Sequence, residues 1–175
     1  MVSPVHDVAV TGISTSRSFA YSGVAANPVQ VNVTAANLGS QGESFWVAAL
    51  ANSTLIGNIT VTNLGAGQNQ IVSFSWPTST LTRGIYNMIV KAQVVNGETA
   101  TSNNSLVVSN GFIVKFKADV NGDCIVDVSD LAIMGAAFGK TRGQTGYTSA
   151  ADINNDAVID VSDLALLGSV FGQHC

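Results

Sequence analysis

A stretch of fourteen residues occurs twice in this chain, with the two copies 33 residues apart. The first copy runs from Asp119 to Ala132 and the second from Asp152 to Ala165, and together they hold every aspartate that follows residue 118. Four carboxylates within twelve residues repel one another at a cost on the order of 1 kcal/mol each near a surface. Chance does not place the same set twice in the same register, so each copy is predicted to bind a cation.

The spacing within each copy is that of a twelve-residue calcium loop, over residues 119–130 and 152–163. Such a loop supplies side-chain oxygens from positions 1, 3, 5, 9 and 12 and a main-chain carbonyl from position 7. The predicted ligands of the first loop are Asp119, Asn121, Asp123, Ile125, Asp127 and Asp130. Those of the second loop are Asp152, Asn154, Asp156, Val158, Asp160 and Asp163. Two bound Ca²⁺ ions are therefore expected.

Two loop positions carry further expectations. Position 6, where calcium loops have glycine, is Cys124 or Ala157, and a residue other than glycine at positive φ costs on the order of 1 kcal/mol. Position 8 is apolar in both copies, as Val126 and Ile159. These two residues are expected to meet in a short β contact between the loops.

Each loop is predicted to lead into a helix, because apolar residues recur at helical spacing after it. The apolar residues are Leu131, Met134, Ala137 and Phe138 after the first loop, and Leu164, Leu167, Val170 and Phe171 after the second. We expect both sets to pack in a core, and each helix to stop at a glycine, Gly139 or Gly172. The segment 141–151 that joins the copies has room for a short helix.

The first part of the chain differs in charge and in periodicity. Acidic residues outnumber basic ones only after residue 118, which indicates a domain boundary between residues 1–118 and 119–175. Alternating apolar and polar residues predict seven strands, near 6–13, 28–36, 44–51, 55–63, 69–76, 84–95 and 105–117. Seven short strands in such a length indicate an immunoglobulin-like β-sandwich. The expected fold class is mainly β, with a small α-helical part at the C-terminal end.

Composition and motifs exclude several functions. The chain has 7 Lys and Arg against 11 Asp and Glu and no basic stripe, so no nucleic-acid partner is expected. No apolar run approaches the roughly 20 residues of a membrane span. His6 and His174 are isolated, and neither a phosphate loop nor a zinc spacing occurs, so no enzyme is expected. No signal peptide is visible, and the chain is interpreted as a fragment of a larger secreted protein.

Residues 1–118 resemble the CARDB family, a cell-adhesion-related immunoglobulin-like domain of prokaryotic surface proteins. The segments that carry the resemblance are 6–11, 37–39, 54–64, 74–76 and 84–86. The resemblance implies a sandwich without catalytic residues, with Tyr86 in a structural corner. Trp46 and Trp76 are expected to be buried.

Residues 119–175 resemble a type I dockerin, the calcium-dependent partner of cohesin domains. Position 12 is Asp in both loops where ordinary EF-hands have Glu, no helix precedes the first loop, and the copies are nearly identical. The resemblance implies a two-fold related pair of helices that contact a cohesin-like partner. The implied contact residues are Val128, Ser129, Val161 and Ser162. Since both copies carry Val-Ser, two binding orientations are implied.

The two cysteines, Cys124 and Cys175, suit either one disulfide or two inert thiols when the sequence is considered alone. In dockerins the chain end returns near the first loop, so the resemblance implies that these cysteines form a disulfide.

The resulting expectation is an extracellular or cell-surface assembly module, whose dockerin binds a cohesin-like partner and whose sandwich acts as a spacer or adhesion domain. One alternative is a carbohydrate- or surface-binding sandwich that uses Trp46, Trp76, Tyr21 or Tyr147. Another is a surface-layer structural protein in which calcium only stabilises the chain.

Overall fold

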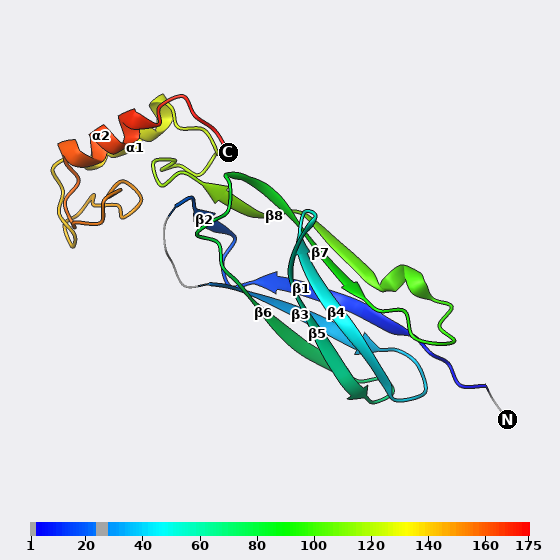
Figure 1. The fold of residues 1–175 in the computed structure, drawn as a ribbon. Coiled ribbons are helices and arrows are strands. Elements are labelled where there is room, and N and C mark those ends of the chain that lie inside the picture. The colour runs from blue at the N-terminus through cyan, green and yellow to red at the C-terminus, as the bar shows by residue number, and fades with distance from the viewer. Residues whose placement is uncertain (1–2, 24–27) are drawn as a thin grey trace. The chain divides into compact units, whose positions relative to one another are not determined.

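The computed structural model describes residues 3–23 and 28–175. These residues form eight strands, one 3-10 helix and two α-helices (Figure 1). The strands are β1 (Val8–Thr15), β2 (Phe19–Tyr21), β3 (Val29–Asn37), β4 (Glu43–Ala51), β5 (Thr54–Leu64), β6 (Asn69–Trp76), β7 (Gly84–Ala92) and β8 (Ser105–Lys115), and the helices are η1 (Thr101–Asn103), α1 (Val128–Ala137) and α2 (Val161–Ser169).

The chain divides into two compact units. The first unit comprises Met1–Ser18, Ala25–Thr78 and Ile85–Phe112, and the second comprises Phe19–Val24, Ser79–Gly84 and Ile113–Cys175. The second unit therefore includes three short segments from the region that was predicted to be the sandwich, together with the whole duplicated region.

The strands form two sheets, which confirms the predicted fold class. One sheet has the order β1-β3-β6 and the other has the order β2-β8-β7-β4-β5. Seven strands correspond to the predicted ones, whereas β2 was not predicted. It has only three residues, too few to show alternation, and it pairs in parallel with Ile113–Lys115 of β8.

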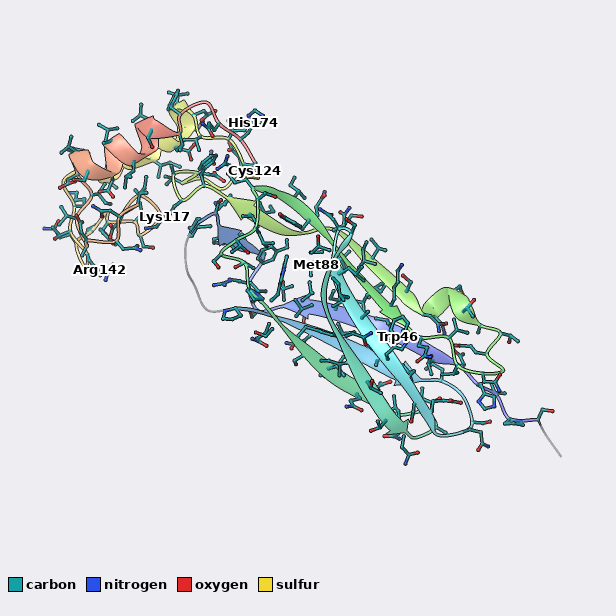
Figure 2. The ribbon with its side chains drawn as sticks, in the orientation of Figure 1. Trp46, Met88, Lys117, Cys124, Arg142 and His174 are labelled. Atoms are coloured by element: carbon teal, nitrogen blue, oxygen red, sulfur yellow. A yellow bond between two sulfur atoms is a disulfide. The ribbon has the colours of Figure 1, made fainter. Side chains whose placement is uncertain are left out.

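The core of the first unit follows the alternation in the strands. In β3 the side chains of Val29, Val31 and Val33 are buried, and Val29 lies opposite Trp76 in β6. Trp76 is buried as expected and packs 4.8 Å from the Phe112 ring, centroid to centroid. Trp46, which Figure 2 labels, is only half-buried, so its predicted burial is wrong in part.

The two α-helices begin in the same way, with an aspartate N-cap, but both end earlier than predicted. Asp127 and Asp160 are the N-caps, and each forms a capping box with the aspartate three residues later. The helices stop at Ala137 and Ser169, before the predicted glycine stops. Gly139 still has a positive φ of 76°, which suits a chain reversal there.

The expected burial of the two apolar sets is wrong for several members. Met134, Ala137 and Leu167 are buried in a small core with Ala118 and Ile153. Leu131, Leu164, Phe138 and Phe171 are instead between 37% and 50% exposed. Phe138 follows the last helical residue in extended conformation, so the helical spacing that predicted its burial no longer applies.

The loops do not pair with each other at position 8, contrary to expectation. Val126 pairs with the segment after α2, since its N–H donates to Gln173 O at 2.8 Å. Ile159 pairs with the segment after α1, since its N–H donates to Lys140 O at 2.9 Å. Each loop is thus completed by the chain that follows the helix of the other copy.

The segment that joins the copies contains no helix. Residues 141–151 form turns, and Thr141 makes an isolated bridge with Val158 of the second loop. Turn hydrogen bonds such as Gln144 N–H to Thr141 O, at 3.0 Å, satisfy the main chain there instead.

Candidate metal centres

The backbone of each loop is folded by its own side chains, in the same way in both copies. In the first loop the N–H of Asp123 donates to Asn121 Oδ1 at 2.9 Å, and the N–H of Ile125 donates to Asp123 Oδ1 at 2.9 Å. In the second loop the equivalent bonds, from Asp156 and Val158, measure 3.0 and 2.9 Å. These Asx turns curve positions 3 to 7 around one centre.

The position-12 aspartates close the loops. Asp130 is fully buried, and its carboxylate accepts the N–H groups of Val120, Asn121 and Asp127 at 2.6, 2.9 and 2.9 Å. Asp163 is also fully buried and accepts the three equivalent N–H groups. Each carboxylate therefore joins the start of its loop to the start of its helix.

Position 6 has the backbone conformation that calcium loops require. Cys124 has a φ of 73° and Ala157 a φ of 74°, both in the left-handed region. A side chain with a Cβ is strained there, so both loops keep the glycine-like turn despite lacking glycine.

The position-1 aspartates are buried in both loops but have different partners. Asp119 accepts the N–H groups of Gly122 and Cys124 at 2.8 and 3.2 Å, and the Lys115 ammonium lies 3.4 Å from its Oδ2. Every oxygen of this carboxylate is therefore bonded.

Asp152 Oδ2 accepts the Tyr147 hydroxyl at 2.6 Å and the N–H of Ala157 at 3.1 Å, with the Arg142 guanidinium at 3.7 Å. Its other oxygen, Oδ1, is buried without a hydrogen bond to the described residues. Burial alone raises the pKa of Asp152, but the bonds from Tyr147 and the backbone outweigh it and the pKa lies below its usual value. The carboxylate is therefore held in its charged form.

The Asp152 carboxylate changes the pKa values of titratable groups around it. The Asp152 carboxylate raises the pKa of the Tyr147 hydroxyl that bonds to it. Burial lowers the pKa of Lys117, although Asp152 and Asp163 oppose that shift. Lys117 and Arg142, which Figure 2 labels, both belong to the second unit.

The donor set fits a hard cation such as Ca²⁺. Each loop offers carboxylate, amide and carbonyl oxygens at the six calcium-loop positions, and the buried Asp152 Oδ1 has a vacant acceptor site. The loop side chains are bonded to their own backbone, and no three of the predicted carboxylate ligands have oxygens within 4.8 Å of one another among the described residues. Their assignment as calcium ligands stays a prediction.

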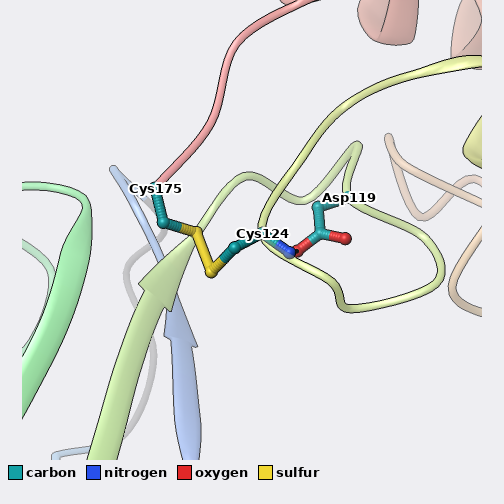
Figure 3. Close-up of side chains that lie close together, drawn as sticks. All are labelled: Asp119, Cys124 and Cys175. Carbon is teal, nitrogen blue, oxygen red and sulfur yellow. Dashed lines mark hydrogen bonds between the residues drawn. A yellow bond between two sulfur atoms is a disulfide. The ribbon is translucent and has the colours of Figure 1, made fainter. Parts of the chain in front are cut away.

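Among the described residues, the potential ligand atoms of Asp119, Cys124 and Cys175 do lie within 4.8 Å of one another (Figure 3). The structure joins these two cysteines in a disulfide, with their Cα atoms 5.1 Å apart. The Cys175 N–H also donates to Cys124 O at 2.9 Å. Disulfide sulfurs offer no thiolate to a metal, so this group is a clasp between the chain end and the first loop.

The two helices and the residues just after them present matched apolar side chains to solvent. Val128 and Val161 are 66% and 67% exposed, and Phe138 and Phe171 are 48% and 50% exposed. Leu131 and Leu164 are both 37% exposed, and Ser129 and Ser162 are exposed as well. Helical spacing predicts burial for the leucines and phenylalanines, because spacing alone does not tell which partner an apolar stripe faces.

None of the described helices has the length and apolar character needed to cross a bilayer.

Comparison with known families matches two models to this chain. A model described as CARDB matches residues 7–108, and a model described as Dockerin type I domain matches residues 117–169. Both are non-catalytic domains that usually occur in extracellular or cell-surface proteins. No curated protein matches the chain.

Among solved structures, the CARDB domain of a Pyrococcus furiosus protein, solved in complex with di-metal ions, has a TM-score of 0.52 and 22% identity. It covers 66% of this chain and 100% of that domain. A cohesin–X-dockerin complex from Acetivibrio cellulolyticus has a TM-score of 0.32 and 14% identity, and covers 74% of this chain and 83% of that one. The likeness to the CARDB domain shows the fold of the β region.

Proposed function

Because the chain belongs to the CARDB family and carries a dockerin type I domain, we propose that it is a calcium-dependent assembly module without catalytic activity. In this proposal residues 119–175 bind a cohesin-like domain, and residues 1–118 act as a spacer or adhesion domain. The protein works outside the cell or at its surface, where the Cys124–Cys175 disulfide persists.

The observation that carries the proposal is the duplicated apolar surface of the two helices. Exposed valine and leucine side chains occur at equivalent positions of α1 and α2, and an exposed phenylalanine follows each helix, with nearly equal exposure in the two copies. Soluble domains seldom expose such apolar sets without a partner. Since the two sets match residue for residue, a partner that fits one set also fits the other, which supports two binding orientations.

The role proposed for calcium is structural. Two Ca²⁺ ions would be held by the six predicted positions of each loop and would neutralise the clustered carboxylates. The helices begin within the loops, at Val128 and Val161, so an ordered loop fixes the helix start. Calcium binding free energy thereby contributes to folding of the binding surface.

Tryptophan exposure gives no support to the carbohydrate alternative. Trp76 is buried against Phe112 and Tyr86, and Trp46 is half-buried in β4. The buried Trp76 therefore offers no open aromatic face on which a sugar ring would stack.

The proposal is tested by measuring binding of the full chain to a type I cohesin by calorimetry, in calcium and in excess chelator. We expect binding in calcium and a loss of at least about 100-fold in chelator. No binding to any cohesin of a representative panel in calcium would contradict the proposal.

Substitution of the duplicated face tests the two orientations. Val128→Asp and Val161→Asp should each leave binding within about threefold of the parent, because the other face remains, whereas the double variant should lose at least about 100-fold. Val107→Asp, at a 54% exposed position of β8, is the matched control. A single variant that abolishes binding would leave one orientation only.

A further inference from the structure

Two lysines of the segment that leads from β8 into the first loop contact both calcium loops. Lys115 Nζ donates to the main-chain carbonyl of Asp119 at 3.0 Å, and Lys117 Nζ donates to that of Asp152 at 3.0 Å. Lys117 Nζ also donates to the carbonyl of Ile153. Asp119 and Asp152 are the position-1 residues of the two loops, so one short segment supplies an ammonium group to each loop.

Lys115 is buried, with 8% of its surface exposed. Its ammonium lies 3.4 Å from Asp119 Oδ2 and 5.1 Å from the centroid of the Phe19 ring. Lysine is seldom buried unless it is paired. The first loop therefore holds a fixed positive charge directly against one of its predicted ligands.

We propose that Lys115 and Lys117 are built-in counter-cations of the two loops, which keep the ion-free loops folded and lower their affinity for calcium. This inference rests on the proposed calcium function. Each loop concentrates four carboxylates, and a nearby ammonium reduces their mutual repulsion when no ion is bound. The same ammonium repels an incoming divalent cation and, at Asp119, competes with it for the carboxylate.

A purely structural role for the lysines predicts a different result. If each lysine only tied down a carbonyl, its removal would loosen the loop and weaken calcium binding. If each lysine is a counter-cation, its removal destabilises the ion-free protein but tightens calcium binding. The two explanations therefore differ in the sign of the change in calcium affinity.

The test uses the full chain with Lys115→Met, Lys117→Met and the double substitution, since methionine keeps the length of the apolar stem. In excess chelator, we expect the melting temperature followed by the helical circular dichroism signal to fall in each variant. In calcium titration calorimetry, we expect the double variant to bind about tenfold more tightly. Lys140→Met is the matched control, because it removes the same charge from the second unit at a side chain without a hydrogen bond or ion pair to either loop among the described residues.

The two lysines are separated by following the amide resonances of Ile125 and Val158 during calcium titration. Lys115→Met should tighten the first loop, reported by Ile125, and Lys117→Met the second, reported by Val158. Unchanged or weaker affinity in these variants, in a parent chain that binds two ions, would overturn the inference alone. A parent chain that binds no calcium would overturn the proposed function together with it.

Discussion

The two halves of the duplicated region, residues 119–142 and 152–175, share an exposed valine and a capping box at the helix start but differ in the contacts that support position 6. Val128 and Val161 are exposed to within one percentage point of each other, and both helices begin with the same capping box. A disulfide joins Cys124 to Cys175, whereas the equivalent pair is Ala157 and Arg142. The helix starts are therefore the same in the two halves, whereas only the first loop is held by a disulfide.

The largest loss of stability is expected from replacing the position-12 aspartates. The loss is predicted to be the same in the two halves. Asp130→Ala and Asp163→Ala each remove a buried carboxylate that accepts three backbone N–H groups. Each should lower the free energy of unfolding of the second unit by at least about 3 kcal/mol and remove one bound calcium ion. Chemical denaturation followed by helical circular dichroism measures the first effect, and calorimetry the second.

Asn121→Ala and Asn154→Ala are milder matched variants for these two aspartates. A difference above about 1 kcal/mol between the stability losses of Asp130→Ala and Asp163→Ala would show that the two position-12 carboxylates do not stabilise their loops equally.

The second largest loss of stability is expected from removing the disulfide, which only the first loop has. Replacing Cys124 and Cys175 together by Ser opens the clasp, whose cysteines are 51 residues apart in sequence. The chain-entropy estimate for such a loop gives a loss of about 4 kcal/mol in the free energy of unfolding. Thermal melting of the double variant, against the parent under the same calcium concentration, gives the value. A loss below about 1 kcal/mol would mean that the clasp contributes little to stability.

A third experiment restores symmetry by adding the missing clasp. The Arg142 N–H donates to Ala157 O at 2.8 Å, as the Cys175 N–H donates to Cys124 O at 2.9 Å. The double substitution Arg142→Cys and Ala157→Cys should therefore form a second disulfide and stabilise the oxidised chain by up to about 3 kcal/mol. Thiol titration and mass spectrometry measure its formation. The reduced double variant is the control, and free thiols under oxidising conditions would show that the halves differ in backbone geometry.

The smallest effect concerns position 6. Ala157→Gly relieves a side chain at a φ of 74° and should raise the free energy of unfolding by about 1 kcal/mol. Ala132→Gly, at an exposed position of α1, should lower it by about the same amount, since glycine weakens a helix interior. Opposite signs in the two variants would support strain at position 6. Equal losses would mean that the Ala157 backbone is not strained.

Much of the fold could be predicted from local patterns. Alternation located seven strands, and the loop spacing located both helix starts, because Asp127 and Asp160 are at once loop position 9 and N-cap. Elements without a local sequence pattern could not be predicted. Strand β2 has three residues, and its pairing with β8 depends on a partner about ninety positions away in the sequence.

The exposure of the apolar residues and the pairing of the loops could not be predicted for another reason. Phe138 continues the apolar spacing of α1 but lies after the helix end, so periodicity wrongly placed it in the core. Val126 and Ile159 each look like partners for the other, yet each pairs with the segment after the other copy's helix. The hydrogen bonds from Lys115 and Lys117 to the two loops could not be predicted either, because only the folded chain brings Lys117 and Asp152 together.

The crossed pairing of loops and following segments has a practical consequence for handling the protein. Val126 donates to Gln173 O, and Gly172 donates to Val126 O at 2.7 Å, so the final residues are structural parts of the first loop. A truncation at residue 171 would damage the half that is farther away in sequence and leave Ile159 paired as before. Insertions or labels placed within residues 172–175 would therefore disturb the main-chain pairing of the first loop.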